Sequence, residues 1–309
     1  MSRGADGGDA APGASGAGRP SRAAGPPPSR DPAAPLPAVP APPAALRQRL
    51  DALAALYERP AFVGEDPVSI PHAFESPADR EVAGLFAAVL AWGRRSVLLA
   101  KLAELVERMR YAPAAFVDGF SETRDAERLE GFKHRTFTPG DAVWLVRAVQ
   151  AARAQHGSLE RTLLAHLPPA SPHVGPGIQG LSSTLLTIVP GTPERLRKHL
   201  ARPGTGSACK RLAMYLRWMV RPGPVDFGLW RGVGAERLIV PLDVHTGRQA
   251  RALGLLSRGT DDWRAALELT AACRTMDPAD PCRYDYALFG LGAYGGEPMP
   301  GDGRELGAG

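Results

Sequence analysis

The stretch EVAGLFAAVLAWG, residues 81–93, constrains the fold more than any other part of this sequence. It is apolar on almost every side of a helix, and such a helix is stable only when other elements cover it all round. A helix start precedes it, because Ser76 is a capping residue, Pro77 suits a first turn and Asp79 places a carboxylate near the positive helix end. We therefore expect a buried central helix that other elements surround.

Similar start signals recur along the chain, and no segment shows the alternation that is typical of a strand. They occur at Thr138, Ser158, Thr192, Ser207, Asp243, Thr260-Asp261-Asp262 and Pro281. We predict an all-α fold of about ten helices joined by short loops marked by Pro and Gly.

The two ends of the chain differ in composition from the middle. Residues 1–45 are rich in Ala, Gly and Pro and cannot bury enough apolar surface to offset their ordering entropy. We expect a disordered tail there, or residues that lie upstream of the true start codon. Residues 46–295 are expected to form a single helical domain, and the Gly-rich residues 296–309 a loose tail.

Several classes of protein are disfavoured by what the sequence lacks. No apolar run approaches the roughly 20 residues of a membrane span, and the N-terminal segment has no apolar core of the secretion-signal type. The scattered Cys209, Cys273 and Cys282 argue against a disulfide framework and a four-cysteine metal or cluster site. We predict a cytoplasmic protein with no metal, no cofactor and no membrane partner, and leave its oligomeric state open.

Basic residues are concentrated in one segment. Residues 195–264 carry 14 Lys and Arg against 5 Asp and Glu, a balance of +9, whereas the whole chain has a net charge of +5. The remainder of the chain is therefore mildly acidic. A local excess of this kind indicates a polyanionic partner such as nucleic acid, although a solvated arginine-rich surface explains it equally well.

Two residues of this basic segment stand at predicted helix starts. Lys210 lies in the first turn of an apolar helix, where burial and the helix dipole would favour the neutral, nucleophilic amine. The alternative is that its flexible stem carries the charge to solvent. Asp243 precedes VHTGRQARAL and is expected to cap that helix, an interaction of about 1 kcal/mol. A cap alone explains this aspartate, but the two residues together form a candidate catalytic pair.

The segments around this pair resemble the helix-hairpin-helix DNA glycosylase superfamily, which includes endonuclease III and the 8-oxoguanine glycosylases. PLDVHTGRQARALGL is similar to the segment that carries the catalytic aspartate of that superfamily, and GSACKRLAMYL to the helix start that carries its catalytic lysine. The resemblance implies a glycosylase-like helical bundle and a DNA glycosylase, with strand cleavage by elimination as a further step. It implies Lys210 as the nucleophile and Asp243 as the group that stabilises a cationic sugar.

The resemblance also implies which residues would hold the nucleic acid. The superfamily's hairpin motif LPGVG is absent, and LARPGTGSACKR stands in its place. Gly204 and Gly206 would form either a tight turn whose N–H groups face a phosphate or a plain loop. The other expected contacts are Arg211, Arg217, Arg221, His245 and Arg248.

A second resemblance covers about residues 46–295. The motifs HRTF, SACKRL, RWMVR, VDFGLW and PLDVHTG are similar to those of an uncharacterised bacterial family, a conserved domain of unknown function. HRTF (His134–Phe137) is either a substrate contact or a loop that pins two helices together. The aromatic residues Tyr215, Trp218, Phe227 and Trp230 could line a base pocket, but helical spacing favours the core for most of them.

Two functions of different classes remain open at this point. One is a glycosylase that acts on a damaged base flipped out of the duplex, and the other is a nucleic-acid-binding protein without catalysis on a similar scaffold. A Lys210 amine within about 6 Å of the Asp243 carboxylate in an open cleft favours catalysis, whereas a buried ion pair without a cleft favours the scaffold. The sequence leaves open the lesion and the choice between DNA and RNA.

Overall fold

The structure is a computed structural model of the chain and describes residues 30–299. The regular elements of this part are helices, as predicted. They comprise thirteen α-helices, ten of them with at least seven residues, and five short 3₁₀ segments. The β contacts between residues 30 and 299 are isolated bridges, and no strand forms there.

In chain order the α-helices are α1 (Ala44–Tyr57), α2 (Ser69–His72), α3 (Pro77–Leu90), α4 (Arg95–Arg108), α5 (Pro113–Asp118), α6 (Glu122–Leu129), α7 (Pro139–His156), α8 (Leu159–Leu164), α9 (Gly175–Thr187), α10 (Lys210–Val220), α11 (Val244–Ala252), α12 (Trp263–Met276) and α13 (Tyr284–Tyr294). The 3₁₀ segments are η1 (Pro60–Glu65), η2 (Glu194–Lys198), η3 (Pro203–Thr205), η4 (Ala235–Arg237) and η5 (Pro281–Arg283).

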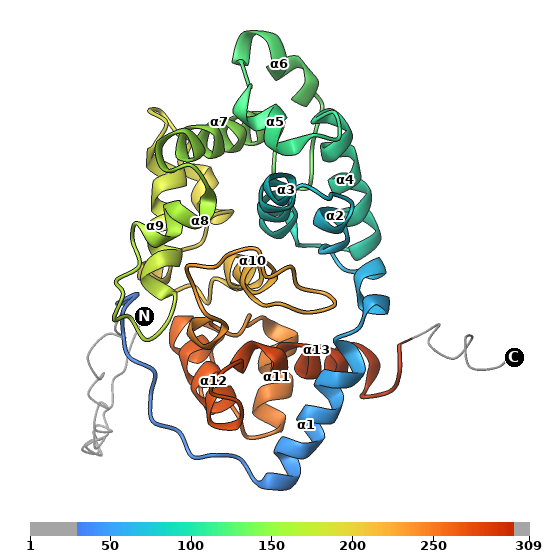
Figure 1. Cartoon of the computed structure of the whole chain (residues 1–309), viewed down its shortest axis with the longest axis vertical. Helices are drawn as coiled ribbons and strands as arrows, with labels where there is room; N and C mark the ends of the chain where they lie inside the picture. The colour runs from blue at the N-terminus through green and yellow to red at the C-terminus, as the bar shows by residue number, and fades with distance from the viewer. Residues whose placement is uncertain (1–29, 300–309) are drawn as a thin grey trace, which may run out of the picture.

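Helix α10 lies across the middle of the molecule (Figure 1). Helices α2 to α9 stand on one side of it, and α11, α12 and α13 stand on the other. Helix α1 joins this second group, because it packs against α13 although the two are far apart in the sequence. Helix α10 packs against α3 and so links the two groups.

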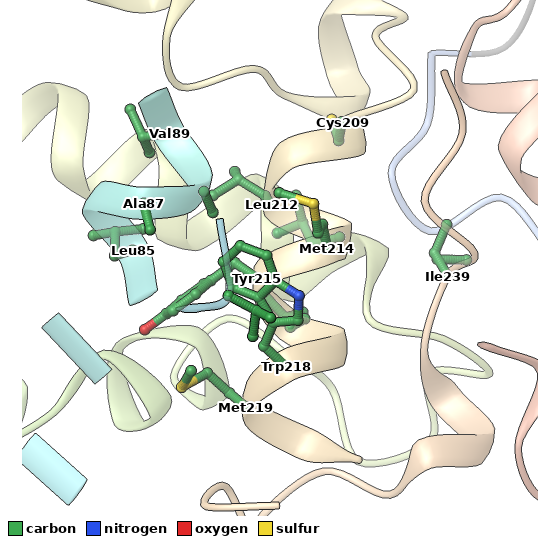
Figure 2. Packing of buried hydrophobic residues seen from close by; sticks show 14 of the residues in the cluster. Leu85, Ala87, Val89, Cys209, Leu212, Met214, Tyr215, Trp218, Met219 and Ile239 are labelled. Atoms are coloured by element: carbon green, nitrogen blue, oxygen red, sulfur yellow. The ribbon is translucent and has the colours of Figure 1, made fainter. Parts of the chain in front are cut away.

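The predicted central helix is α3, and every residue from Val82 to Leu90 is buried. Figure 2 shows its side chains beside those of α10 in the core. Gly84 permits this close approach, because a Cβ atom there would lie 2.9 Å from Cε of Met219. Tyr215 and Trp218 of α10 are completely buried, so these rings belong to the core and do not line a base pocket.

The local capping signals are confirmed where short side chains meet the first turn. Thr138 Oγ1 accepts a hydrogen bond from the N–H of Asp141, whose Oδ2 accepts one from the N–H of Thr138 at 2.8 Å. Ser158 Oγ accepts a hydrogen bond from the N–H of Arg161 at 3.1 Å. These reciprocal contacts satisfy N–H groups that have no partner within the helix.

Three starts differ from the prediction in kind or position. The segment after Thr192 is the 3₁₀ turn η2 and not an α-helix. Helix α10 begins at Lys210, and Cys209 precedes it without a side-chain capping hydrogen bond, although Ser207 was expected to mark the start. Pro281 opens the 3₁₀ turn η5, and α13 follows it.

The structure describes the last part of the segment that was expected as a disordered tail, residues 1–45. Residues 30–43 run as an extended strap along the molecule, and α1 begins at Ala44 (Figure 1). Nε2 of His173 lies 2.8 Å from the carbonyl oxygen of Ala34 and forms a hydrogen bond with it. Proline fixes an extended backbone in advance, so this strap loses little entropy when it packs.

The structure describes residues 296–299 of the segment that was expected as a loose tail, residues 296–309. Tyr57 Oη donates a hydrogen bond to the carbonyl of Glu297 at 2.7 Å, and Met299 is buried. The rest of the two expected tails, residues 1–29 and 300–309, lies outside the described residues.

The following findings on membrane-spanning helices, cysteines and metal-ligand groups apply to residues 30–299. None of the helices in this range combines the length and apolarity that a membrane span needs. The three cysteines are buried free thiols. No three His, Cys, Asp or Glu side chains of these residues are grouped as metal ligands would be.

A buried network of charges holds α10 in place. Nε of Arg217 lies 3.3 Å from Asp226 Oδ1, and Nη1 of Arg221 lies 2.5 Å from Asp226 Oδ2. The other carboxylates of the network are Asp285, which pairs with Arg217, and Glu58 and Asp280, which pair with Arg221. Burial alone would lower the pKa of both guanidinium groups, but the carboxylates outweigh burial and raise it. Both arginines are therefore charged at every pH at which the protein folds.

Replacement of Asp226 should destabilise the protein strongly. Asp226→Asn removes the one carboxylate that both buried guanidinium groups share, and a broken buried ion pair costs roughly 3 kcal/mol of the free energy of unfolding. Chemical denaturation measures this change. Glu194→Gln is the control, because Glu194 pairs with Arg197 at the surface. Equal stability of the two variants would show that the network does not hold α10.

Candidate functional site

Lys210 and Asp243 lie together in the structure. Nζ of Lys210 is 3.7 Å from Oδ2 of Asp243, well inside the separation that favours catalysis. The side chains are 32% and 36% exposed, so neither is sealed in the core. Two helix N-termini, those of α10 and α11, thus bring an amine and a carboxylate to one accessible place.

Asp243 divides its two oxygens between two tasks. Oδ1 accepts hydrogen bonds from the N–H groups of His245 and Thr246, each at 2.9 Å, which caps α11 as predicted. Oδ2 is left to face Lys210. Burial alone would raise the pKa of this carboxyl, but Lys210 and the two N–H groups outweigh it and hold the pKa below its usual value. Asp243 is therefore anionic at neutral pH.

The turn before α10 sets the place of Lys210. Cys209 precedes it in the left-handed conformation, with φ 53° and ψ 29°, which costs a non-glycine residue about 1 kcal/mol. Ser207 Oγ accepts a hydrogen bond from the N–H of Cys209 at 3.1 Å and so supports this turn. The N–H of Trp263 donates to the carbonyl of Gly206, which ties the turn to the start of α12.

A pocket of about 360 Å³ opens beside the pair. Its lining comes from the end of η2, from the turn before α10 and from the start of α11, and includes Lys198, His199, Cys209, Arg211, Leu242, Val244 and Asp261. Val244 is 70% exposed although it is apolar. The volume lies at the small end of the range for ligand sites, roughly 300–1,000 Å³, and is sufficient for a base or a sugar.

Two of the predicted phosphate contacts are wrong. Arg217 and Arg221 are 4% and 2% exposed and are held by buried carboxylates, so neither guanidinium group is available to a phosphate. Sequence alone placed them in a basic segment, whereas the fold turns them inward toward acidic side chains from distant segments. Their charge is structural.

The glycines that replace the hairpin motif also do not face a phosphate. The N–H of Gly204 donates to Oε1 of Gln179 at 2.9 Å, and the N–H of Gly206 donates to the carbonyl of Pro203 at 2.7 Å. Gly206 has φ 85°, a conformation that glycine adopts without strain. Of the two alternatives from the sequence, the structure shows the plain loop.

The remaining predicted contacts lie at or near the pocket. Arg211 lines it, but its guanidinium donates to the carbonyls of Val89 and Lys198 and ties the end of α3 to η2. His245 and Arg248 are exposed on the first turns of α11. Contact of these three residues with nucleic acid stays a prediction.

Sequence reasoning missed two pocket residues, Lys198 and His199. A signal for the lysine was present, because the chain has 33 arginines and only 4 lysines. Two of those four, Lys198 and Lys210, line this one pocket. Lysine and arginine are not interchangeable chemically, so two of the four lysines at one pocket distinguish it from the arginine-rich remainder of the chain.

Protonation of His199 should oppose folding. The residue is 3% exposed, and burial lowers the pKa of its imidazole to about 4, with Arg211, Lys198 and His134 adding to the effect and Asp141 opposing it. Between pH 6.5 and 4 the unfolded chain then binds a proton that the folded protein does not. Stability falls as the pH drops through this window, by up to about 3 kcal/mol from this group.

The measurement is the free energy of unfolding against pH for the wild type and for His199→Gln. The wild-type curve should fall more steeply between pH 6.5 and 4 than the variant's curve. Parallel curves would contradict the burial of a neutral imidazole at this position.

Comparison with known proteins gives a family and no activity. The model of a family described as a protein of unknown function, DUF2400, matches residues 66–294. No curated protein and no solved structure matches the chain.

Proposed function

The chain belongs to the DUF2400 family, which is one of unknown function, and from this premise we propose that it is a DNA glycosylase with lyase activity whose nucleophile is Lys210. One observation carries the proposal. The Lys210 amine lies 3.7 Å from the Asp243 carboxylate, accessible to solvent and beside a pocket large enough for a base. A buried ion pair without a pocket would have supported a scaffold without catalysis.

The reaction begins when a nucleotide leaves the duplex and its base enters the pocket. The Lys210 ammonium gives up a proton to solvent, to which its 32% exposed side chain has access, so that Asp243 stays ionised. The amine lone pair then forms a bond to the sugar carbon C1′, and the base leaves with the electron pair of the glycosidic bond and takes up a proton. Opening of the sugar ring yields a Schiff base between Lys210 and the sugar.

Asp243 acts on the charge that develops during base loss. Positive charge accumulates on the sugar as the glycosidic bond breaks, and a fixed carboxylate stabilises it without reorganisation. The two hydrogen bonds from the start of α11 to Oδ1 provide that fixity. In the elimination that follows, C2′ of the Schiff base would lose a proton and the C3′–O bond would break with release of the 3′ phosphate, which cleaves the strand.

Positive charge close to the pocket supports a nucleic-acid substrate. Lys198 is exposed at its rim, and His245 and Arg248 are exposed on α11 beside Asp243. This footprint is smaller than the +9 balance of residues 195–264 suggests, because Arg217 and Arg221 are buried. Only a few phosphate contacts are therefore expected. The affinity for DNA should fall as the salt concentration rises, with the shallow slope that a few such contacts produce.

Borohydride trapping tests the proposal. The protein is mixed with duplexes that contain an abasic aldehyde, uracil, hypoxanthine or 8-oxoguanine, and borohydride reduces any Schiff base to a stable adduct. We expect an adduct with the abasic duplex and with at least one damaged base. Lys210→Ala should abolish both adducts, because Lys101, whose amine pairs with Glu104, does not line the pocket.

Two further variants separate the role of Asp243 from that of the nucleophile Lys210. Asp243→Asn should slow trapping of the base-bearing duplex by about 10²–10³-fold but retain the abasic adduct, because an aldehyde needs no charge stabilisation at C1′. Lys198→Arg is the matched control and should leave both adducts intact. Absence of an adduct on every duplex overturns the proposal in favour of binding without catalysis, whereas an adduct that survives in Lys210→Ala overturns the assignment of Lys210 as the nucleophile.

A further inference from the structure

His199 is a polar residue of the pocket that the proposed chemistry does not use. It follows η2 and lines the same pocket as Lys210 and Asp243. Its side chain is 3% exposed, and its buried Nε2 atom has no hydrogen-bond partner among the described residues. A buried polar atom without a partner costs roughly 1–3 kcal/mol, so its retention requires an explanation.

Aromatic rings fix the orientation of the imidazole. The ring of Phe137 meets it edge to face at 5.1 Å between centroids, and the ring of Trp92 lies 5.7 Å away. Trp92 in turn packs at 4.9 Å against His134, whose Nε2 bonds the carbonyl of Trp92. These rings surround the imidazole and offer no polar partner to Nε2, which is itself sealed; a base in the pocket would therefore meet the other ring nitrogen, Nδ1.

The HRTF motif builds this support. His134 and Phe137 exchange backbone hydrogen bonds in a tight turn, and both side chains are buried. The exposed Arg135 sits in the left-handed conformation with φ 53°, and its guanidinium lies 5.6 Å from the Trp92 ring. The motif therefore supports residues at the wall of the pocket, and none of its four residues lines the pocket itself.

The imidazole is neutral at physiological pH. Burial and the neighbouring Arg211 and Lys198 lower the pKa of His199 to about 4. A neutral imidazole carries one N–H donor and one acceptor nitrogen. This combination suits the uncharged polar edge of a heterocyclic base better than it suits a phosphate, which prefers a cation.

We propose that His199 hydrogen-bonds the base that enters the pocket and so determines which bases the protein removes. The proposal rests on the glycosylase function above and names the group that selects its substrate. A pocket with a polar group that must be satisfied rejects a ligand that lacks the matching atom. Phe137 and Trp92 are positioning residues in this account, because they act through His199.

The test compares two kinds of substrate in one protein. Trapping rates are measured for His199→Phe and for the wild type, on the abasic duplex and on the best base-bearing duplex of the panel. The variant should keep the abasic rate and lose about tenfold or more on the base-bearing duplex. His199→Gln, which restores a donor and an acceptor, should recover part of that loss.

The abasic duplex serves as the internal control for folding, since a misfolded variant loses both rates together. His173→Phe is the matched variant, because His173 is a buried histidine that does not line this pocket. Equal effects of His199→Phe on both duplexes, or no effect on either, overturn the assignment of His199 alone. A wild type that traps the abasic duplex but no base-bearing one also overturns it and leaves the lysine chemistry standing. A wild type that traps nothing overturns the glycosylase function itself.

Discussion

Burial of α10 is the constraint on which the rest of the structure depends. Every residue from Leu212 to Val220 is buried, including Arg217, so its charge must be balanced by carboxylates from other segments. Asp226, Asp285, Asp280 and Glu58 come from the loop after α10, from α13, from the start of η5 and from the end of α1. Since buried charges tolerate little displacement from their partners, these pairs fix the position of α10.

The candidate site inherits its geometry from that arrangement. Helix α13 supplies Asp285 to Arg217 of α10 and packs against α11, the helix that Asp243 caps. One helix, α13, therefore fixes the positions of both α10, which carries the amine, and α11, which the carboxylate caps. The cap and the reactive pair, which looked like competing explanations of Asp243, are compatible because each uses a different oxygen.

The sequence predicts well those features that depend only on residues close together in the chain. The capping of α7, α8 and α11 depends on residues three positions apart, so Thr138, Ser158 and Asp243 were read correctly. The inward direction of Arg217 and Arg221 depends on carboxylates from about five to 163 positions away, and composition cannot report it. The strap over residues 30–43 looked disordered for a similar reason, because its prolines and small apolar residues are ordered only by the surface on which they lie. His199 was missed because an isolated histidine shows its surroundings only in the fold.

The central claim is that one lysine among four is the reactive amine. The most direct measurement is peptide mass spectrometry of the protein after borohydride reduction with an abasic duplex. The account predicts that the added sugar mass maps to the peptide that contains Lys210. A label on Lys198, which lines the same pocket, or on the N-terminal amine, would contradict it.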